Sequence, residues 1–264
     1  MSVFRPAAPG ARLASKVDHV LGAALGGDHD ATLDVNAPDM LAEAEPVADV
    51  ISAALERAGP GLEAQLAVTN TFRRSRMDVD LVNALVHPDP TVRIAGARLC
   101  GALRLPEAVP WLADLLDDPV PVVRDVAVRA LGQAGGRRVV EALMLHADSL
   151  PQHRVAKELS RAASDIDLER LLREDGSVRT TVIVVMACGL RGDALRGPLL
   201  VTMAQDRECD TQIRVAACRA VGMIGHPAGA DAMRMLARDP DLVIRNAAVR
   251  ARMRISAAMR KRTA

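Results

Sequence analysis

Residues 112–132, LADLLDDPVPVVRDVAVRALG, decide the fold of this chain. Their pattern predicts an amphipathic helix of about ten residues, a proline-containing turn and a second helix that ends in glycine. Proline cannot continue the first helix, but it fits the first turn of the next one. The stretch therefore predicts a pair of antiparallel helices joined by a tight turn.

The same pattern recurs from about residue 81 onward. One arginine lies near the start of each second helix, and these six anchoring arginines are Arg93, Arg124, Arg154, Arg179, Arg214 and Arg245. The positions two and three residues after each are mostly small, which makes the inward-facing stripe of a helix. Glycine follows at 101, 132 and 222, near where we expect these helices to end. The repeats at 143–162 and 171–190 are degenerate.

The ends of the chain have different compositions. Residues 1–16 are rich in Pro, Ala and Gly and predict a flexible tail, whereas residues 17–78 predict an acidic N-terminal segment and a helical cap. In that cap we expect one helix to end near Gly59 and the next to run from Leu62 to Arg74. Residues 17–56 carry nine acids and no Lys or Arg, and residues 250–262 carry six bases and no acid.

Residues 79–264 resemble HEAT repeats, in particular the short bacterial type also found in phycobilisome lyases. The resemblance is strongest in DDPVPVVRDVAVRALG (117–132) and RDPDLVIRNAAVRAR (238–252). It implies an all-α fold, an α-solenoid of antiparallel helix pairs with about six repeats after the N-terminal cap.

The resemblance also implies a ladder between neighbouring repeats, formed by an acid in the turn and an arginine six residues later. Asp118/Arg124 and Asp239/Arg245 match that spacing, and Glu208/Arg214 is a conservative variant. His87 replaces the acid in the first repeat. The third and fourth repeats lack it, so we expect the ladder to be interrupted in the middle.

A second set of arginines lies five residues after the anchors, at Arg98, Arg129, Arg219 and Arg250. Five residues turn a helix by about 140°, so these side chains project away from the anchors. The resemblance implies that second helices line the concave face, where the arginines could meet an acidic protein partner. The alternative is a solvated face, because Asp125 and Arg129 already form an i,i+4 pair.

The opposite charges of the two ends suggest a further hypothesis. The acidic segment 17–56 folds over the arginines, either within one chain or in a neighbouring copy. The basic C-terminus has two interpretations of its own: it contacts phosphate or an acidic protein, or it complements a helix dipole at the polar end of the array.

Chemistry-bearing motifs are absent from the sequence. It contains no GxSxG, HExxH or phosphate-binding glycine motif, and its four cysteines form no CxxC pair. Asp28, His29 and Asp30 lack the glycine and glutamate of a calcium loop. We therefore expect no catalytic residue, metal or cofactor, and we favour a non-enzymatic protein–protein interaction scaffold or adaptor.

Two other functions stay open. One is chromophore-lyase-like handling of a tetrapyrrole on a partner protein. The other is nucleic-acid binding of the DNA glycosylase kind, disfavoured by a net charge of +1 and by only three aromatic residues for base stacking. The longest apolar run, Val182 to Leu190, is about half of a membrane span, and no secretory signal is evident, so we expect a cytoplasmic protein.

Overall fold

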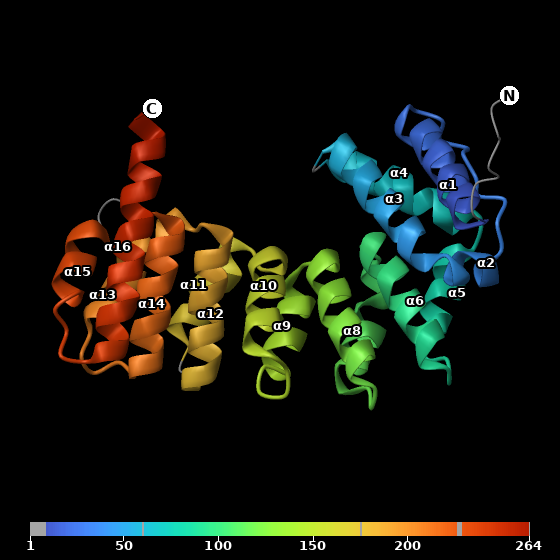
Figure 1. Cartoon of the computed structure of the whole chain (residues 1–264). Helices are drawn as coiled ribbons and strands as arrows, with labels where there is room; N and C mark the ends of the chain where they lie inside the picture. The colour runs from blue at the N-terminus through green and yellow to red at the C-terminus, as the bar shows by residue number, and fades with distance from the viewer. Residues whose placement is uncertain (1–8, 60, 175, 226–228, 264) are drawn as a thin grey trace, which may run out of the picture. The chain divides into compact units, whose positions relative to one another are not determined.

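The computed structural model describes residues 9–59, 61–174, 176–225 and 229–263, and within these ranges it contains helices and no strand (Figure 1). The predicted all-α class is confirmed. The chain forms two compact units, unit 1 (Met1–Gly135) and unit 2 (Gly136–Ala264). The predicted division into a tail, a cap and a solenoid places a boundary at residue 79, inside unit 1.

Unit 1 holds the N-terminal helices and two helix pairs. Its elements are α1 (Pro9–Leu25), α2 (Ala37–Ala42), α3 (Ala44–Ala58), α4 (Leu62–Arg74), α5 (Met77–Ala84), α6 (Pro90–Ala102), η1 (Pro106–Ala108), α7 (Val109–Asp114), η2 (Leu115–Asp117) and α8 (Pro121–Ala134). Helices α5 and α6 form one pair and α7 and α8 the next. The second helices α6 and α8 pack against each other, and α3 packs on the other side of α6.

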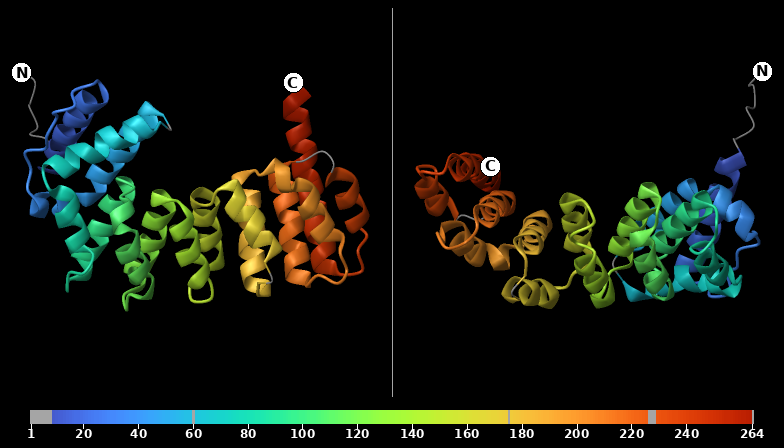
Figure 2. Two further views of the ribbon diagram at one scale, coloured as in Figure 1. Left: turned by 180° about the vertical axis from the view of Figure 1, so that it is seen from behind. Right: turned by 90° about the horizontal axis from the view of Figure 1, so that it is seen from below.

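Unit 2 holds four further pairs. Its elements are α9 (Arg137–Leu145), α10 (Gln152–Ala162), α11 (Asp165–Arg173), α12 (Val178–Arg191), η3 (Ala194–Arg196), α13 (Gly197–Gln205), α14 (Thr211–Ile224), α15 (Gly229–Leu236) and α16 (Leu242–Thr263). The second helices α10, α12, α14 and α16 stand side by side, coloured from yellow-green to red in Figure 2. Six pairs therefore follow the cap, as the repeat pattern predicts.

The N-terminus is more ordered than its composition suggests. Helix α1 begins at Pro9, so the expectation of a flexible tail through residue 16 is wrong for residues 9–16, whereas residues 1–8 lie outside the described part. Ala14, Val17, Leu21 and Ala24 are buried at helical spacing, and α1 packs against α3 and α4. The buried positions of α1 extend to both sides of residue 16, the predicted end of the tail. Only Ala14 lies before it, so the composition of residues 1–16 alone did not indicate a helix.

Glycines 101, 132 and 222 lie in the last turns of α6, α8 and α14, near the helix ends as expected. The residues at the C-caps of α8 and α14 are Gly135 and Gly225, both with positive φ. A Cβ on Gly101 would lie 2.6 Å from the Cα of Ala130, and one on Gly222 would lie 2.7 Å from the Cα of Ala251. These glycines therefore let consecutive second helices pack closely.

The anchoring arginines connect successive turns. Arg93 donates from Nε to Oδ2 of Asp118 (2.8 Å) and from Nη2 to Oδ1 (3.1 Å), and Nη1 bonds the carbonyls of His87 and Pro88 in its own turn. Asp118 also accepts from the backbone N–H of Val120 at 2.8 Å. Asp118 therefore pairs with the arginine of the preceding repeat.

Unit 2 repeats this arrangement. Arg214 donates to the carboxylate of Asp239 (2.9 Å) and to the carbonyl of Ala204. The sequence pairs six residues apart meet only through the backbone, because Arg124 bonds the carbonyl of Asp118 and Arg245 that of Asp239. The carboxylate contacts of the ladder therefore run between neighbouring repeats, in Arg93–Asp118 and Arg214–Asp239.

The third predicted rung is different. Glu208 is exposed, and its side chain makes no hydrogen bond or ion pair with Arg214, so its assignment to the ladder is not supported by the described contacts. Arg179, the preceding anchor, instead donates to the carbonyls of Ala147 and Leu150, with Asp148 at 3.7 Å. Arg179 therefore bonds the turn of the preceding repeat, whereas Arg93 and Arg214 bond an acid of the following one.

Candidate functional site

The projecting arginines of unit 1 lie on adjacent second helices. Arg98 stands one turn before Gly101 on α6, and Arg129 precedes Ala130, which packs on Gly101. The Nη1 of Arg98 lies 3.0 Å from Oε2 of Glu45, in the first turn of α3. Arg129 lies 3.8 Å from Asp125, the i,i+4 neighbour. Both unit 1 arginines therefore already face a carboxylate of their own chain.

Glu45 belongs to the acidic segment 17–56, so within unit 1 one acid of this segment meets one arginine of the stripe. The other acids have varied surroundings: Asp18 pairs with Arg57, and Asp39 bonds Asn36 at the start of α2. Both Glu45 and Arg98 are partly exposed, so their pair contributes little to stability. It does, however, lower the net positive charge of the α6 surface.

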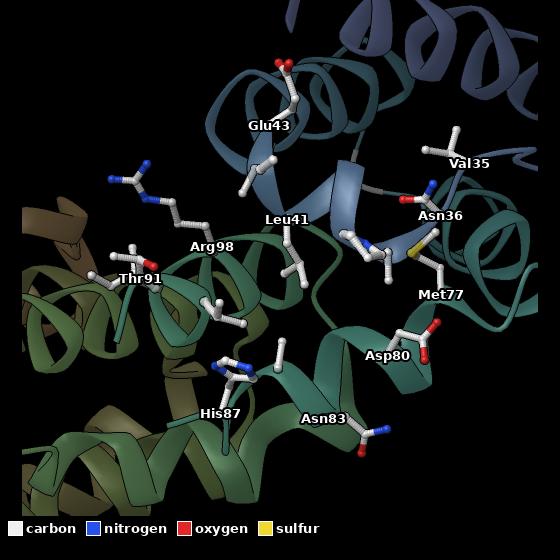
Figure 3. A pocket seen from close by; sticks show the side chains of 18 of the residues that line it. Val35, Asn36, Leu41, Glu43, Met77, Asp80, Asn83, His87, Thr91 and Arg98 are labelled. Atoms are coloured by element: carbon white, nitrogen blue, oxygen red, sulfur yellow. The ribbon is translucent and has the colours of Figure 1, made fainter. Parts of the chain in front are cut away.

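Two hollows meet at Arg98 and Glu45. The larger, about 1290 Å³, lies between α2, the start of α3, α5 and α6 (Figure 3). In this view Arg98 and Thr91 lie on one side of it, and Asn36 and Met77 on the other. The smaller, about 170 Å³, lies between α3 and α8 and includes Arg129. The sequence did not reveal the larger hollow, because no motif marks the residues of α2 that wall it.

In unit 2 the equivalent arginines are Arg219 on α14 and Arg250 on α16. Gly222, one turn after Arg219, packs on Ala251, the residue after Arg250, so this pair repeats the relation of Arg98 to Arg129. Both side chains are exposed, and among the described residues neither has an ion-pair partner.

The neighbouring helix explains this difference between the units. Helix α3, beside α6, begins AEPVADV and supplies Glu45. Helix α12, beside α14, has the sequence VRTTVIVVMACGLR and contains no acid. Arg219 and Arg250 are therefore exposed to solvent, whereas Arg98 at the equivalent position in unit 1 pairs with Glu45.

A hollow of about 550 Å³ lies beside the unit 2 arginines. We call it the basic groove, and it is lined by Gly189, Leu190, Arg191, Gly192, Gly222, Met223, Arg254, Ala257, Ala258 and Lys261. Arg191 is already bonded to the carbonyl of Ala163 and to the carboxylate of Asp165. Arg254 and Lys261 are exposed and have no ion pair with any described residue. The basic C-terminal residues were evident from sequence, but the groove beside them was not.

Residues 79–163 and 167–252 match the family model described as HEAT repeats, which covers more than half of the chain. The chain belongs to the HEAT repeat family. The predicted resemblance is thereby confirmed, and the ladder and the close-packed glycines are features of this HEAT array. No curated protein sequence compared with the chain matches it.

Several solved structures align with the HEAT chain. Human deoxyhypusine hydroxylase in complex with glycerol is 18% identical, with 94% of this chain and 98% of that one covered and a TM-score of 0.37. The phycocyanin lyase complex of CpcE and CpcF from Nostoc sp. is 19% identical, with 80% and 94% covered and a TM-score of 0.35. An engineered protein is 18% identical, with 91% and 96% covered and a TM-score of 0.33.

Three of the four cysteines of the HEAT array are buried, and Cys209 is half-buried. Burial raises the pKa of the Cys100 and Cys188 thiols to about 12, so neither is a thiolate nucleophile near neutral pH. Among the described residues, no group of three or more His, Cys, Asp or Glu side chains is placed to hold a metal ion. In the same residues, no helix has the length and apolarity that crossing a membrane requires.

Proposed function

We propose that this HEAT repeat chain is a non-enzymatic scaffold or adaptor that binds an acidic protein partner through the arginines of its second helices. The observation that carries the proposal is the contrast between the two units. Arg98 meets a carboxylate supplied by α3, whereas Arg219 and Arg250, in the same helix positions, meet none among the described residues. A partner's carboxylates would supply the missing opposite charge.

Two properties of the surface support recognition of a protein. Arg219 and Arg250 project from α14 and α16, which pack closely through Gly222 and Ala251. This contact fixes the distance between the backbones that carry the two arginines, which lowers the cost of ordering them on binding. Arginine also binds carboxylates through two parallel N–H donors, which favours geometric specificity over simple charge attraction. Unit 1, where the chain's own acids are close, is the weaker candidate for the same partner.

A pull-down from the source cell tests the proposal. The double variant Arg219→Glu/Arg250→Glu should lose the proteins that the wild-type chain captures, and the loss should be at least about tenfold, corresponding to 1.4 kcal/mol. The matched control is Arg207→Glu/Arg238→Glu, which makes the same change of charge at exposed turn residues of unit 2. Equal capture by both double variants would contradict the proposal.

An absorption spectrum of the purified protein addresses the alternative of tetrapyrrole handling. If the chain is a scaffold, the purified protein should not absorb visible light and should still bind its protein partners. A bound pigment that absorbs visible light would overturn the non-enzymatic scaffold in favour of the chromophore-lyase alternative.

A further inference from the structure

The basic groove of unit 2 combines an apolar floor with unpaired cations. Met223 projects from α14, with 36% of its surface exposed, and its terminal methyl lies over Gly189 of α12. Ala257 and Ala258 of α16 form the opposite side, and Ala258 packs on Gly225. Small side chains and an adaptable methionine leave room for apolar side chains of a ligand.

The cations lie along α16, where Arg254 and Lys261 line the groove and Arg250 stands one turn before Arg254. Arg250, Arg254 and Lys261 are separated by four and seven residues along α16, so they share one helix face. At 1.5 Å per residue they extend over about 16 Å, or three helical turns. A ligand that meets all three must therefore be extended along α16.

Glu45 shows the kind of group that such arginines accept within this chain. It stands on α3, which carries Asp49 one turn further on, and both line the hollow beside Arg98 and Arg129. Carboxylates four residues apart on a helix therefore already face arginines of the second helices. In unit 2 the adjacent helix α12 has no acid to do so.

The composition of the groove separates this ligand from other anions. No aromatic side chain lines the groove, so it lacks the stacking surface that single-stranded nucleic acids use. Its apolar residues are Leu190, Met223, Ala257 and Ala258, so Leu190 is its one residue of the Trp, Phe or Leu kind that helices at membrane surfaces insert. Helix-in-groove recognition needs the two features that are present, a shallow apolar floor and a charged edge.

We propose that the basic groove binds an amphipathic acidic helix of the partner protein, with apolar side chains against Met223, Ala257 and Ala258, and carboxylates on Arg250, Arg254 and Lys261. The inference rests on the proposed function and specifies the partner's chemistry. It assigns the three C-terminal cations to binding, in addition to the arginine pair Arg219 and Arg250.

Fluorescence anisotropy with defined peptides tests the inference on the full chain. The probe is an 18-residue capped helix with leucines on one face and glutamates at i,i+4 beside them. One control peptide replaces every glutamate by glutamine, and the other has the same composition in an order that destroys the apolar face. The acidic amphipathic helix should bind at least tenfold more tightly than either control, and the difference should shrink at 0.5 M salt.

Protein variants then locate the binding. Arg254→Glu/Lys261→Glu should weaken binding of the acidic helix at least tenfold, and Met223→Gln several-fold, whereas Arg207→Glu/Arg238→Glu should leave it within twofold. Each variant is compared with wild type by circular dichroism. Because the peptide controls use the wild-type chain, the test does not depend on any variant folding.

Three results would overturn the inference: equal binding of the acidic and glutamine peptides, unchanged binding by Arg254→Glu/Lys261→Glu, or tighter binding of a single-stranded RNA or of phosphatidylserine vesicles than of the acidic helix. Failure here is distinguishable from failure of the proposed function. If the acidic helix does not bind but Arg219→Glu/Arg250→Glu still loses its partners in the pull-down, the scaffold proposal stands and only the groove assignment fails.

Discussion

Asp118→Asn tests whether the turn acids hold consecutive repeats together. Only 5% of the Asp118 side chain and 12% of the Arg93 side chain are exposed, and the carboxylate accepts two bonds from Arg93 and one from the N–H of Val120. Asparagine can still accept the hydrogen bond from the N–H of Val120, but it lacks the negative charge of the carboxylate. Its N–H₂ group would face the guanidinium of Arg93, which can only donate. The change therefore leaves Arg93 largely buried without its counter-ion.

The expected cost follows from these contacts. A hydrogen bond to a charged group contributes about 1.5–3 kcal/mol, and breaking a fully buried ion pair costs about 3–5 kcal/mol. Arg93 keeps its bonds to the carbonyls of His87 and Pro88, which reduces the loss. We therefore expect Asp118→Asn to lower the free energy of unfolding of unit 1 by about 2–3 kcal/mol.

Urea unfolding followed by circular dichroism at 222 nm measures this loss as a shift of the midpoint at constant slope. Glu208→Gln is the matched control, because Glu208 has the sequence spacing of a ladder acid without a contact to Arg214. It should change the free energy of unfolding by less than about 0.5 kcal/mol. An Asp118→Asn variant as stable as Glu208→Gln would show that the Arg93–Asp118 contact does not hold consecutive repeats together.

Three further predictions concern pH, packing and thiols. Burial raises the pKa of Asp118, but the Arg93 and Val120 hydrogen bonds and nearby arginine charges outweigh it, so the pKa lies below its ordinary 3.8. The stabilisation that ionised Asp118 gives to the folded state is therefore complete above pH 3.8 and disappears as the pH falls through the lower pKa of the folded state. The free energies of unfolding of wild type and Asp118→Asn should accordingly converge as the pH is lowered. Gly222→Ala should destabilise unit 2 by about 1–3 kcal/mol in thermal unfolding, because its Cβ would meet Ala251, whereas Gly22→Ala, in open space on α1, should be neutral or stabilising. A thiol reagent should modify only half-buried Cys209 in the native protein and all four cysteines after unfolding; rapid native labelling of Cys209→Ser would contradict the burial of the others.

The sequence predicted the repeat well, because an arginine marks the start of each second helix and proline marks the turn before it in four of the six copies. Pro121 begins α8, and Arg124 lies in its first turn, as Arg93 does in α6 after Pro90. The apolar stripe of each second helix then follows from helical spacing alone. These features are local, so they can be derived from residues a few positions apart.

The ladder could be predicted only in part, because its contacts join different repeats. Arg93 lies 25 residues before Asp118, and Arg214 lies 25 residues before Asp239. Counting 25 residues from Arg93 and Arg214 reaches Asp118 and Asp239, whereas Glu208 lies 29 residues after Arg179. The six-residue spacing identifies Asp118 and Asp239 as ladder acids, but it does not say which arginine each acid meets.

The binding surface was the least predictable part. The projecting positions of Arg98, Arg129, Arg219 and Arg250 follow from helix geometry. Their different surroundings do not, because they depend on which helix packs alongside. Glu45 reaches Arg98 only because α3 occupies the place of a second helix beside α6, and the basic groove exists only where α12, α14 and α16 meet. Tertiary packing decides both.

Photo-cross-linking in the source cell tests whether the second-helix surface of unit 2 binds the partner. Benzoylphenylalanine replaces Met223 in the basic groove or, as the control, Met235, which is 68% exposed on the first helix α15. We expect a cross-linked protein from position 223 that is absent from position 235 and lost in Arg219→Glu/Arg250→Glu. A protein cross-linked equally from both positions, or unaffected by the arginine substitutions, would contradict it.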